Sequence, residues 1–221
     1  MHWKEWQPFY QEIVEQFSFS IEQDREAARV LDSLLNGKER CDEGCLSAAI
    51  ADTVTVCGDA DRLLTDLERY GTEGTLVCAD GATSKVLSLG LLPDLIVTDL
   101  DGRPEDQVFA SEEGAVTVVH AHGDNIPALR KFVPRLKGQV AGSAQSGDQG
   151  AVKCYGGFTD GDRAVILARH FGAKRIRLLG FDFDQPAAKS GREPSRKKAK
   201  LAWARRLIFD LNPASVELWT P

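Results

Sequence analysis

The stretch Leu95-Ile96-Val97-Thr98-Asp99-Leu100-Asp101-Gly102 decides the fold that the sequence predicts. Its apolar, β-branched first half follows Pro93, which cannot continue a preceding helix, so the run predicts a buried strand. Asp99 and Asp101 then fall at the carboxyl end of this strand, where open α/β sheets bind their ligands. Because strand side chains alternate, we expect both carboxylates on one face, repelling each other unless a cation such as Mg²⁺ lies between them. The simpler alternative is two solvated aspartates in a turn.

The composition is that of a globular protein with a substantial core. The chain has 221 residues, of which 43% are hydrophobic and 27% are charged. Lys and Arg number 27 and Asp and Glu number 33, so the net charge is −6. This mildly acidic balance disfavours non-specific nucleic-acid binding but suits a nucleotide enzyme whose metal ions neutralise phosphates. No apolar run reaches the roughly 18 residues of a membrane span, and residues 1–6 lack a signal-peptide core, so we expect a cytoplasmic protein without membrane contact.

The cysteines are expected to be reduced. There are five: Cys41, Cys45, Cys57, Cys78 and Cys154. Their odd number, and the apolar runs around three of them, favour buried thiols in a reducing compartment. The four-residue spacing of Cys41 and Cys45 would also suit zinc, but no second pair of ligands follows at a suitable distance, which disfavours a structural zinc site.

Strand-like and helix-like segments alternate from about residue 50. The strand-like segments are 53–57, 75–79, 95–98, 115–119, 139–142, 151–155, 175–180 and 215–218. This alternation predicts an α/β fold with a mostly parallel, Rossmann-like sheet and helices on both faces. A charged loop is predicted over residues 185–198, before the last helix. Residues 1–36 carry apolar side chains at helical spacing. We therefore predict a helical N-terminal extension over residues 1–45 and an α/β domain over residues 46–221.

Acidic residues recur where the predicted strands end. They are Asp80 after 75–79, Asp99 and Asp101 after 95–98, Asp124 after 115–119, and Asp160 and Asp162 after 151–155. In a parallel sheet all these exits lie along one edge. So many carboxylates on one rim would repel one another without cations, which predicts a divalent-metal site for a polyphosphate.

Glycine accompanies each of these acids, at Gly81, Gly102, Gly123, Gly157 and Gly161. Glycine lets backbone N–H groups approach phosphate oxygens, although turning of the chain explains any one of them. Thr159 or Asp160 can cap the next helix, whose N-terminus would face an anion. His120 and His122 flank the same rim, where a histidine could orient a phosphate, bind a substrate ring or simply pack against its neighbours.

Three segments resemble thiamine pyrophosphokinase, namely Ala79–Ala82, Pro93–Gly102 and Gly156–Arg163. The corresponding signatures of that family are an Ala-Asp-Gly-Gly turn, a Pro-Asp-x-Ile-x-Gly-Asp-x-Asp-Ser strand end and a later Gly-Gly-x-x-Asp-His. This chain departs from all three, with Ala82 for the second glycine, Gly102 for the serine and Gly161 for the histidine.

Those departures, together with His120-Ala-His-Gly-Asp-Asn125 and the segment 156–164, look more like the archaeal-type 6-hydroxymethyl-7,8-dihydropterin diphosphokinase. The similarity runs from about residue 75 to 184. It implies transfer of the terminal diphosphate of ATP to the hydroxymethyl group of a pterin, with Mg²⁺ as cofactor and AMP as product. The implied setting is methanopterin or folate synthesis in an archaeal cytoplasm, and the implied partners are ATP and 6-hydroxymethyl-7,8-dihydropterin. A homo-oligomer is left open.

The predicted site, taken with this reaction, suggests roles for individual residues. The metal ligands would be Asp80, Asp99 and Asp101. The catalytic residues would be His122, Asp124 and Asp160, with one of the two carboxylates positioning the hydroxymethyl oxygen or accepting its proton. The ATP and phosphate contacts would be Gly81, Asn125, Thr159, Asp162, Arg163 and Lys198. The basic cluster of Arg192, Arg196, Lys197, Lys198 and Lys200 is either a phosphate lid or a solvated surface.

Three other functions fit parts of the pattern. The nearest is the same chemistry on thiamine. A metal-dependent sugar-nucleotide glycosyltransferase also needs an Asp-x-Asp after a strand, such as Asp99-Leu100-Asp101. The last is a nucleotide-binding module without catalysis.

Overall fold

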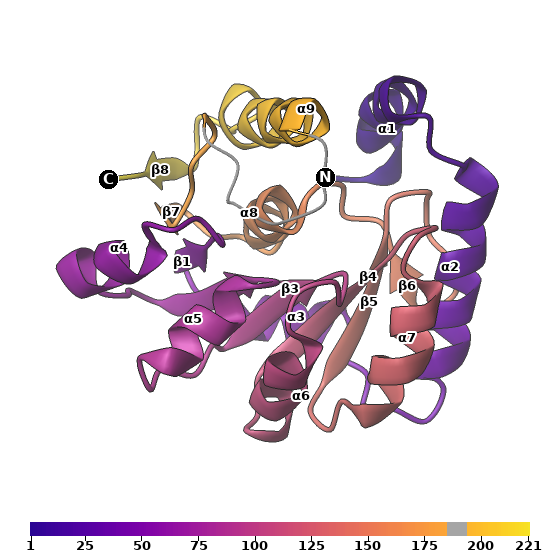
Figure 1. Ribbon diagram of the computed structural model, residues 1–221, viewed down its shortest axis with the longest axis horizontal. Coiled ribbons are helices and arrows are strands. Elements are labelled where there is room, and N and C mark those ends of the chain that lie inside the picture. The colour runs from indigo at the N-terminus through magenta and orange to yellow at the C-terminus, as the bar shows by residue number, and fades with distance from the viewer. Residues whose placement is uncertain (185–193) are drawn as a thin grey trace.

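The computed structural model describes residues 1–184 and 194–221 as a sheet with helices on both sides (Figure 1). Three helices precede the first strand: α1 (Trp3–Phe17), α2 (Ile21–Leu35) and α3 (Glu43–Ala49). The strands are β1 (Thr53–Cys57), β2 (Thr75–Ala79), β3 (Leu95–Thr98), β4 (Val116–Ala121), β5 (Val140–Ala144), β6 (Val152–Lys153), β7 (Arg175–Leu179) and β8 (Glu217–Trp219). The later helices are α4 (Leu63–Tyr70), α5 (Ala82–Ser88), α6 (Pro104–Glu112), α7 (Ile126–Phe132), α8 (Asp160–His170) and α9 (Pro194–Arg205).

The strands form one sheet in the order β6-β5-β4-β3-β2-β1-β7-β8, and every pair is parallel. The predicted α/β fold is therefore confirmed, and within the described residues the sheet is parallel throughout. Every residue of β2, β3, β4 and β5 is buried, which is why these strands read as continuous apolar runs in the sequence. Because the strands are parallel, their carboxyl ends lie along one edge of the sheet.

Helices cover both faces of this sheet, as predicted. Helices α4, α5, α6 and α7 cover one face, and α2 packs beside α7 against β4 and β5. Helix α8 crosses the other face over β1, β2 and β3, and α1 and α9 lie over α8 (Figure 1). Helix α8 thus brings its N-terminus to the edge where β2 and β3 end. The division into parts 1–45 and 46–221 stays a prediction.

Two predictions about local structure are wrong. Cys41 and Cys45 form a disulfide, because the first turn of α3 and its Asp42 cap bring their Cα atoms within 5.2 Å. Cys57, Cys78 and Cys154 are buried free thiols, as expected. The charged loop predicted over residues 185–198 ends early, since α9 already begins at Pro194. The rest of that loop, including Arg192, lies outside the described residues. Within the part of the chain that is described, no helix is long and apolar enough to cross a membrane.

Candidate active site

A cavity of about 860 Å³ lies over the carboxyl edge of the sheet. Its floor is made by the residues that follow β1, β2, β3 and β4, and by the start of α8. The first turn of α2 and the residues after β7 form its walls, and α9 lies above it. Of the predicted site residues, this cavity brings together Asp80, Gly81, Asp99, Asp101, His122, Asp124, Asn125, Thr159, Asp160 and Arg163.

The chain turns sharply after β3, between the carboxylates of Asp99 and Asp101. The strand ends at Thr98, and Leu100 has a φ of 67°, in the left-handed region that a non-glycine residue seldom adopts. The Thr98 hydroxyl accepts a hydrogen bond from the Leu100 N–H (2.8 Å), and an Asp99 carboxylate oxygen accepts one from the Asp101 N–H (3.0 Å). Both residues lie beyond the strand, so strand alternation does not set their directions, but both line the cavity.

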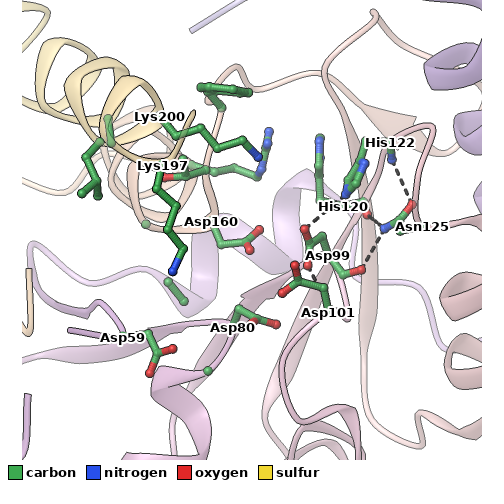
Figure 2. Close-up of a pocket in the computed structure, with 18 of the residues that line it drawn as sticks. Asp59, Asp80, Asp99, Asp101, His120, His122, Asn125, Asp160, Lys197 and Lys200 are labelled. Carbon is green, nitrogen blue, oxygen red and sulfur yellow. Dashed lines mark hydrogen bonds and ion pairs between the residues drawn. The ribbon is translucent and has the colours of Figure 1, made fainter. Parts of the chain in front are cut away.

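Three carboxylates meet at the centre of the floor. Asp80, Asp99 and Asp160 each offer an oxygen within 4.8 Å of the others, a spacing and donor type suited to a hard divalent cation (Figure 2). The third member of this triad is Asp160, predicted as catalytic, whereas Asp101, predicted as a ligand, lines the exposed side of the cavity. Asp160 joins the triad because α8 begins at this residue, directly above the ends of β2 and β3.

Asp80 is fixed in place before any ligand binds. One of its oxygens accepts hydrogen bonds from the Thr98 hydroxyl (2.8 Å) and the Gln107 amide (2.9 Å). A Cβ atom at Gly102 would overlap the other side of this carboxylate, so a serine there would force Asp80 to move. Burial and the nearby charges of Asp99 and Asp101 raise the pKa of Asp80 to about 6.

The other two triad members differ in their electrostatics. Burial and the charges of Asp99 and Asp80 raise the pKa of Asp160 well above its usual range. Burial opposes ionisation of Asp99 as well, but hydrogen bonding and the proximity of His122 outweigh it and lower the pKa of Asp99. The three carboxylates thus repel one another when all are ionised, and a bound cation would offset this repulsion.

His122 and Asn125 act together on Asp99. The His122 Nε2 atom lies 3.2 Å from an Asp99 carboxylate oxygen. The Asn125 amide donates to the backbone carbonyls of Asp99 (2.8 Å) and His120 (2.7 Å), and its oxygen accepts the His122 N–H (3.0 Å). Asn125 was predicted to bind phosphate, but in this structure its side chain joins the exits of β3 and β4. Asp124, between them, is exposed at the mouth of the cavity.

The start of α8 separates three residues that were predicted to share one role. Thr159 and Arg163 line the cavity, with Arg163 almost fully buried and donating to the Gly156 carbonyl (3.2 Å). Asp162 does not line it: its buried carboxylate accepts the N–H groups of Phe158 (2.6 Å) and Thr159 (2.9 Å). Asp162 therefore caps the N-terminus of α8, and its contact with phosphate stays a prediction.

Helix α9 presents two lysines to the cavity. Lys197 and Lys200 project from α9 towards the carboxylates, whereas Lys198 is exposed and is not among the lining residues (Figure 2). The Lys200 amine lies 5.2 Å from the centre of the Phe158 ring. Lys198 points elsewhere because a one-residue step on a helix turns a side chain by about 100°, and its contact with phosphate stays a prediction. The side of α9 that faces the cavity carries Lys197, Lys200, Leu201 and Ala204. Their spacing of three and four residues is typical of one helix face, so this face could have been recognised from the sequence.

Several lining residues carry no prediction from the sequence. They include Phe19, Asp24, Asp59, Gln145, Phe158, Phe181 and Phe183. Asp59 follows β1 and pairs with Lys85 (3.1 Å), and Phe181 and Phe183 follow β7. Their position directly after strands was the available signal. Phe19 and Asp24 had none, since they come from the N-terminal helices.

Comparisons with known proteins identify the family of this chain. Residues 51–187 match the model of the MptE-like 6-hydroxymethylpterin diphosphokinases. The chain belongs to this family. A 6-hydroxymethyl-7,8-dihydropterin pyrophosphokinase of Methanothermobacter thermautotrophicus is 40% identical over 219 residues, with 92% of each chain covered. A protein of the same description from Pyrococcus furiosus is 42% identical over 218 residues, covering 94% of this chain and 93% of the relative.

A third relative so described, from Methanocaldococcus jannaschii, is 37% identical over 195 residues, covering 83% of this chain and 80% of the relative. These matches confirm the resemblance to the archaeal-type pterin enzymes rather than to thiamine pyrophosphokinase. They also make the chain a pyrophosphokinase of the MptE-like family.

Proposed function

We propose that this MptE-like protein transfers a diphosphate group from ATP to the hydroxymethyl oxygen of 6-hydroxymethyl-7,8-dihydropterin and releases AMP. The observation that carries this proposal is the triad of Asp80, Asp99 and Asp160, whose oxygens lie within 4.8 Å of one another inside a cavity large enough for two substrates. The descriptions of three relatives, 37% to 42% identical, support the pterin as acceptor.

The triad is where we propose that Mg²⁺ is held. All three residues offer hard oxygen donors, and the raised pKa values of Asp80 and Asp160 reflect a concentration of negative charge that a cation would stabilise. When bound there, Mg²⁺ would neutralise the charge of the transferring phosphates. His122 and Asn125 would keep Asp99 turned towards the ion through its carboxylate and its backbone carbonyl.

The remaining residues would orient the reactants. Lys197 and Lys200 reach over the floor and would contact the β- and γ-phosphates. The hydroxymethyl oxygen forms a bond to the β-phosphorus while the bond to the α,β-bridging oxygen breaks, which leaves AMP. The hydroxyl proton needs an acceptor; because Asp160 belongs to the triad, we assign this role to Asp124, which lines the cavity outside it.

The test is product analysis with purified protein, ATP, Mg²⁺ and one acceptor at a time. We expect AMP and a diphosphorylated pterin in equal amounts, measured by chromatography and ³¹P NMR, with no turnover of thiamine. AMP formation with thiamine alone would contradict the proposal. Turnover of a sugar nucleotide without turnover of ATP would indicate a glycosyltransferase instead.

A further inference from the structure

One part of the cavity lining, which we call the α2 lobe, is defined by Phe19, Asp24, His120, Gln145 and Phe158. The lobe lies beside Asp99, because the rings of His120 and His122 are 6.1 Å apart and His122 contacts the Asp99 carboxylate. His120 and Asp59 lie on opposite sides of the carboxylate triad (Figure 2). A planar ligand in the lobe would therefore have one edge next to the proposed metal site.

His120 contributes to this lobe a buried ring nitrogen that has no hydrogen-bond partner among the described residues. The side chain is only 2% exposed, and its Nδ1 atom lies 3.1 Å from the Ser143 hydroxyl. Its Nε2 atom has no hydrogen-bond partner among the described residues. Burial and the positive charge of Arg163 hold the pKa of His120 well below its usual value, so the ring stays neutral.

The hydrogen bonds around His120 indicate which kind of partner Nε2 would take. The Ser143 hydroxyl is positioned to donate to the Val119 carbonyl (3.4 Å), which leaves its oxygen to accept the Nδ1–H of His120. In this tautomer Nε2 is an acceptor. A buried acceptor without a partner is destabilising, so it fits a ligand that supplies an N–H donor.

Asp24 provides a second acceptor in the same lobe. Its carboxylate, 3% exposed, accepts hydrogen bonds from the Tyr10 hydroxyl (2.8 Å), the Gly123 N–H (2.9 Å) and the Gln145 amide (2.9 Å). A carboxylate has about four lone-pair sites, so these three bonds fix its orientation and leave one acceptor site. The rings of Phe19 and Phe158, 6.1 Å apart, supply an apolar wall.

We propose that the α2 lobe binds the pterin ring and that His120 Nε2 accepts a hydrogen bond from a ring N–H. This inference rests on the proposed function. A 2-amino-4-oxo ring carries N–H donors on adjacent positions, its amino group and N3, whereas adenine offers only its exocyclic amine. The two acceptors, His120 Nε2 and the Asp24 carboxylate, therefore suit the pterin better. The adenosine of ATP then occupies the opposite side, beside Asp59 and the stacked rings of Phe181 and Phe183.

Two variants of His120 separate ligand binding from structure. His120→Asn keeps a polar group near Nδ1 for Ser143 but is too short to reach the Nε2 position, whereas His120→Gln places its amide oxygen there. Isothermal titration of the full-length protein with 6-hydroxymethyl-7,8-dihydropterin should show about 5- to 100-fold weaker binding for His120→Asn, with His120→Gln recovering most of the affinity. Affinity for α,β-methylene-ATP with Mg²⁺ should stay within about twofold in both variants.

Equal pterin affinity of His120→Asn and the wild type would overturn the assignment. So would a loss confined to the ATP analogue, which would put the nucleotide in this lobe. Absence of AMP formation by a wild type that binds the pterin would instead overturn the proposed function. The melting temperature of each variant confirms that the folded protein is compared.

Discussion

The floor and the roof of the cavity are built on different principles. On the floor, Asp80 and Asp99 follow directly from buried strands and are fixed by short hydrogen bonds from Thr98, Gln107 and Asn125. The roof is one face of α9, whose Lys197 and Lys200 carry their charges on long flexible stems. The floor is thus preorganised in shape, whereas the roof supplies charge that adapts to a phosphate chain.

The floor and the roof also differ in their effect on the stability of the folded protein. Burial and mutual repulsion raise the pKa of Asp80 and of Asp160, so the floor is destabilising until a cation binds. Burial raises the pKa of Asp99, but His122, the Asp101 N–H and, to a smaller extent, the charge of Lys200 lower it. Stability is lost at the floor because function requires close carboxylates, a common feature of active sites.

Removing one floor carboxylate should have the largest effect on activity. We expect Asp80→Asn to lower kcat/KM for diphosphate transfer by about 10²–10³-fold, since a fixed charge-stabilising group is lost. Asp101→Asn is the matched variant, because Asp101 lines the same cavity but lies outside the triad, and we expect it to lose about tenfold. Steady-state rates with varied Mg²⁺ measure both. Equal losses in the two variants would contradict a site centred on Asp80, Asp99 and Asp160.

The same substitution should stabilise the metal-free protein. The pKa of Asp80 is about 6 in the folded state against an ordinary value of 3.8, so folding binds this proton more tightly and ionisation destabilises the fold. The penalty is absent below about pH 4 and complete above about pH 6. With EDTA at pH 7.5, Asp80→Asn should therefore unfold at a higher temperature, by about 1–3 kcal/mol or several degrees, and match the wild type near pH 4.

Added Mg²⁺ supplies the control for this prediction. It should raise the melting temperature of the wild type more than that of Asp80→Asn, because only the wild type has the complete triad. A variant that is less stable than the wild type at pH 7.5 without metal would show that the carboxylate stabilises the fold.

The sheet and the floor were largely predictable from the sequence, and for one reason. Strands buried on both faces read as uninterrupted apolar runs, so β2 and β3 could be located to within a residue, and their exits then followed. Asp80 and Asp99 were assigned to the metal on this basis. Parallel topology alone makes such exits neighbours, without knowledge of any side-chain conformation.

The roles of the remaining site residues could not be predicted, because they depend on the residue at which a helix begins or a turn forms. Asp160 and Asp162 are two residues apart, yet one points into the triad and the other caps α8, and a shift of one residue in the helix start would exchange such roles. The left-handed Leu100 turns Asp101 out of the triad, which no pattern in the sequence signals. The contribution of Phe19 and Asp24 required knowing that α2 packs beside β4 and β5.

The smallest effect should come from the roof, where α9 allows a comparison of neighbouring residues. Lys200→Ala and Lys197→Ala should each lower kcat/KM about tenfold, mainly by raising KM for ATP, because a flexible cation contributes a charge-assisted contact worth about 1.4 kcal/mol. Lys198→Ala is the matched control: the same charge is removed one residue away, on the exposed side of α9, and we expect kcat/KM within about twofold of the wild type. A loss in Lys198→Ala equal to that in Lys200→Ala would mean that α9 acts through net charge rather than through the face that it turns to the floor. Repeating the series at high salt distinguishes the two, since a general field is screened whereas a direct contact in a closed cavity largely persists.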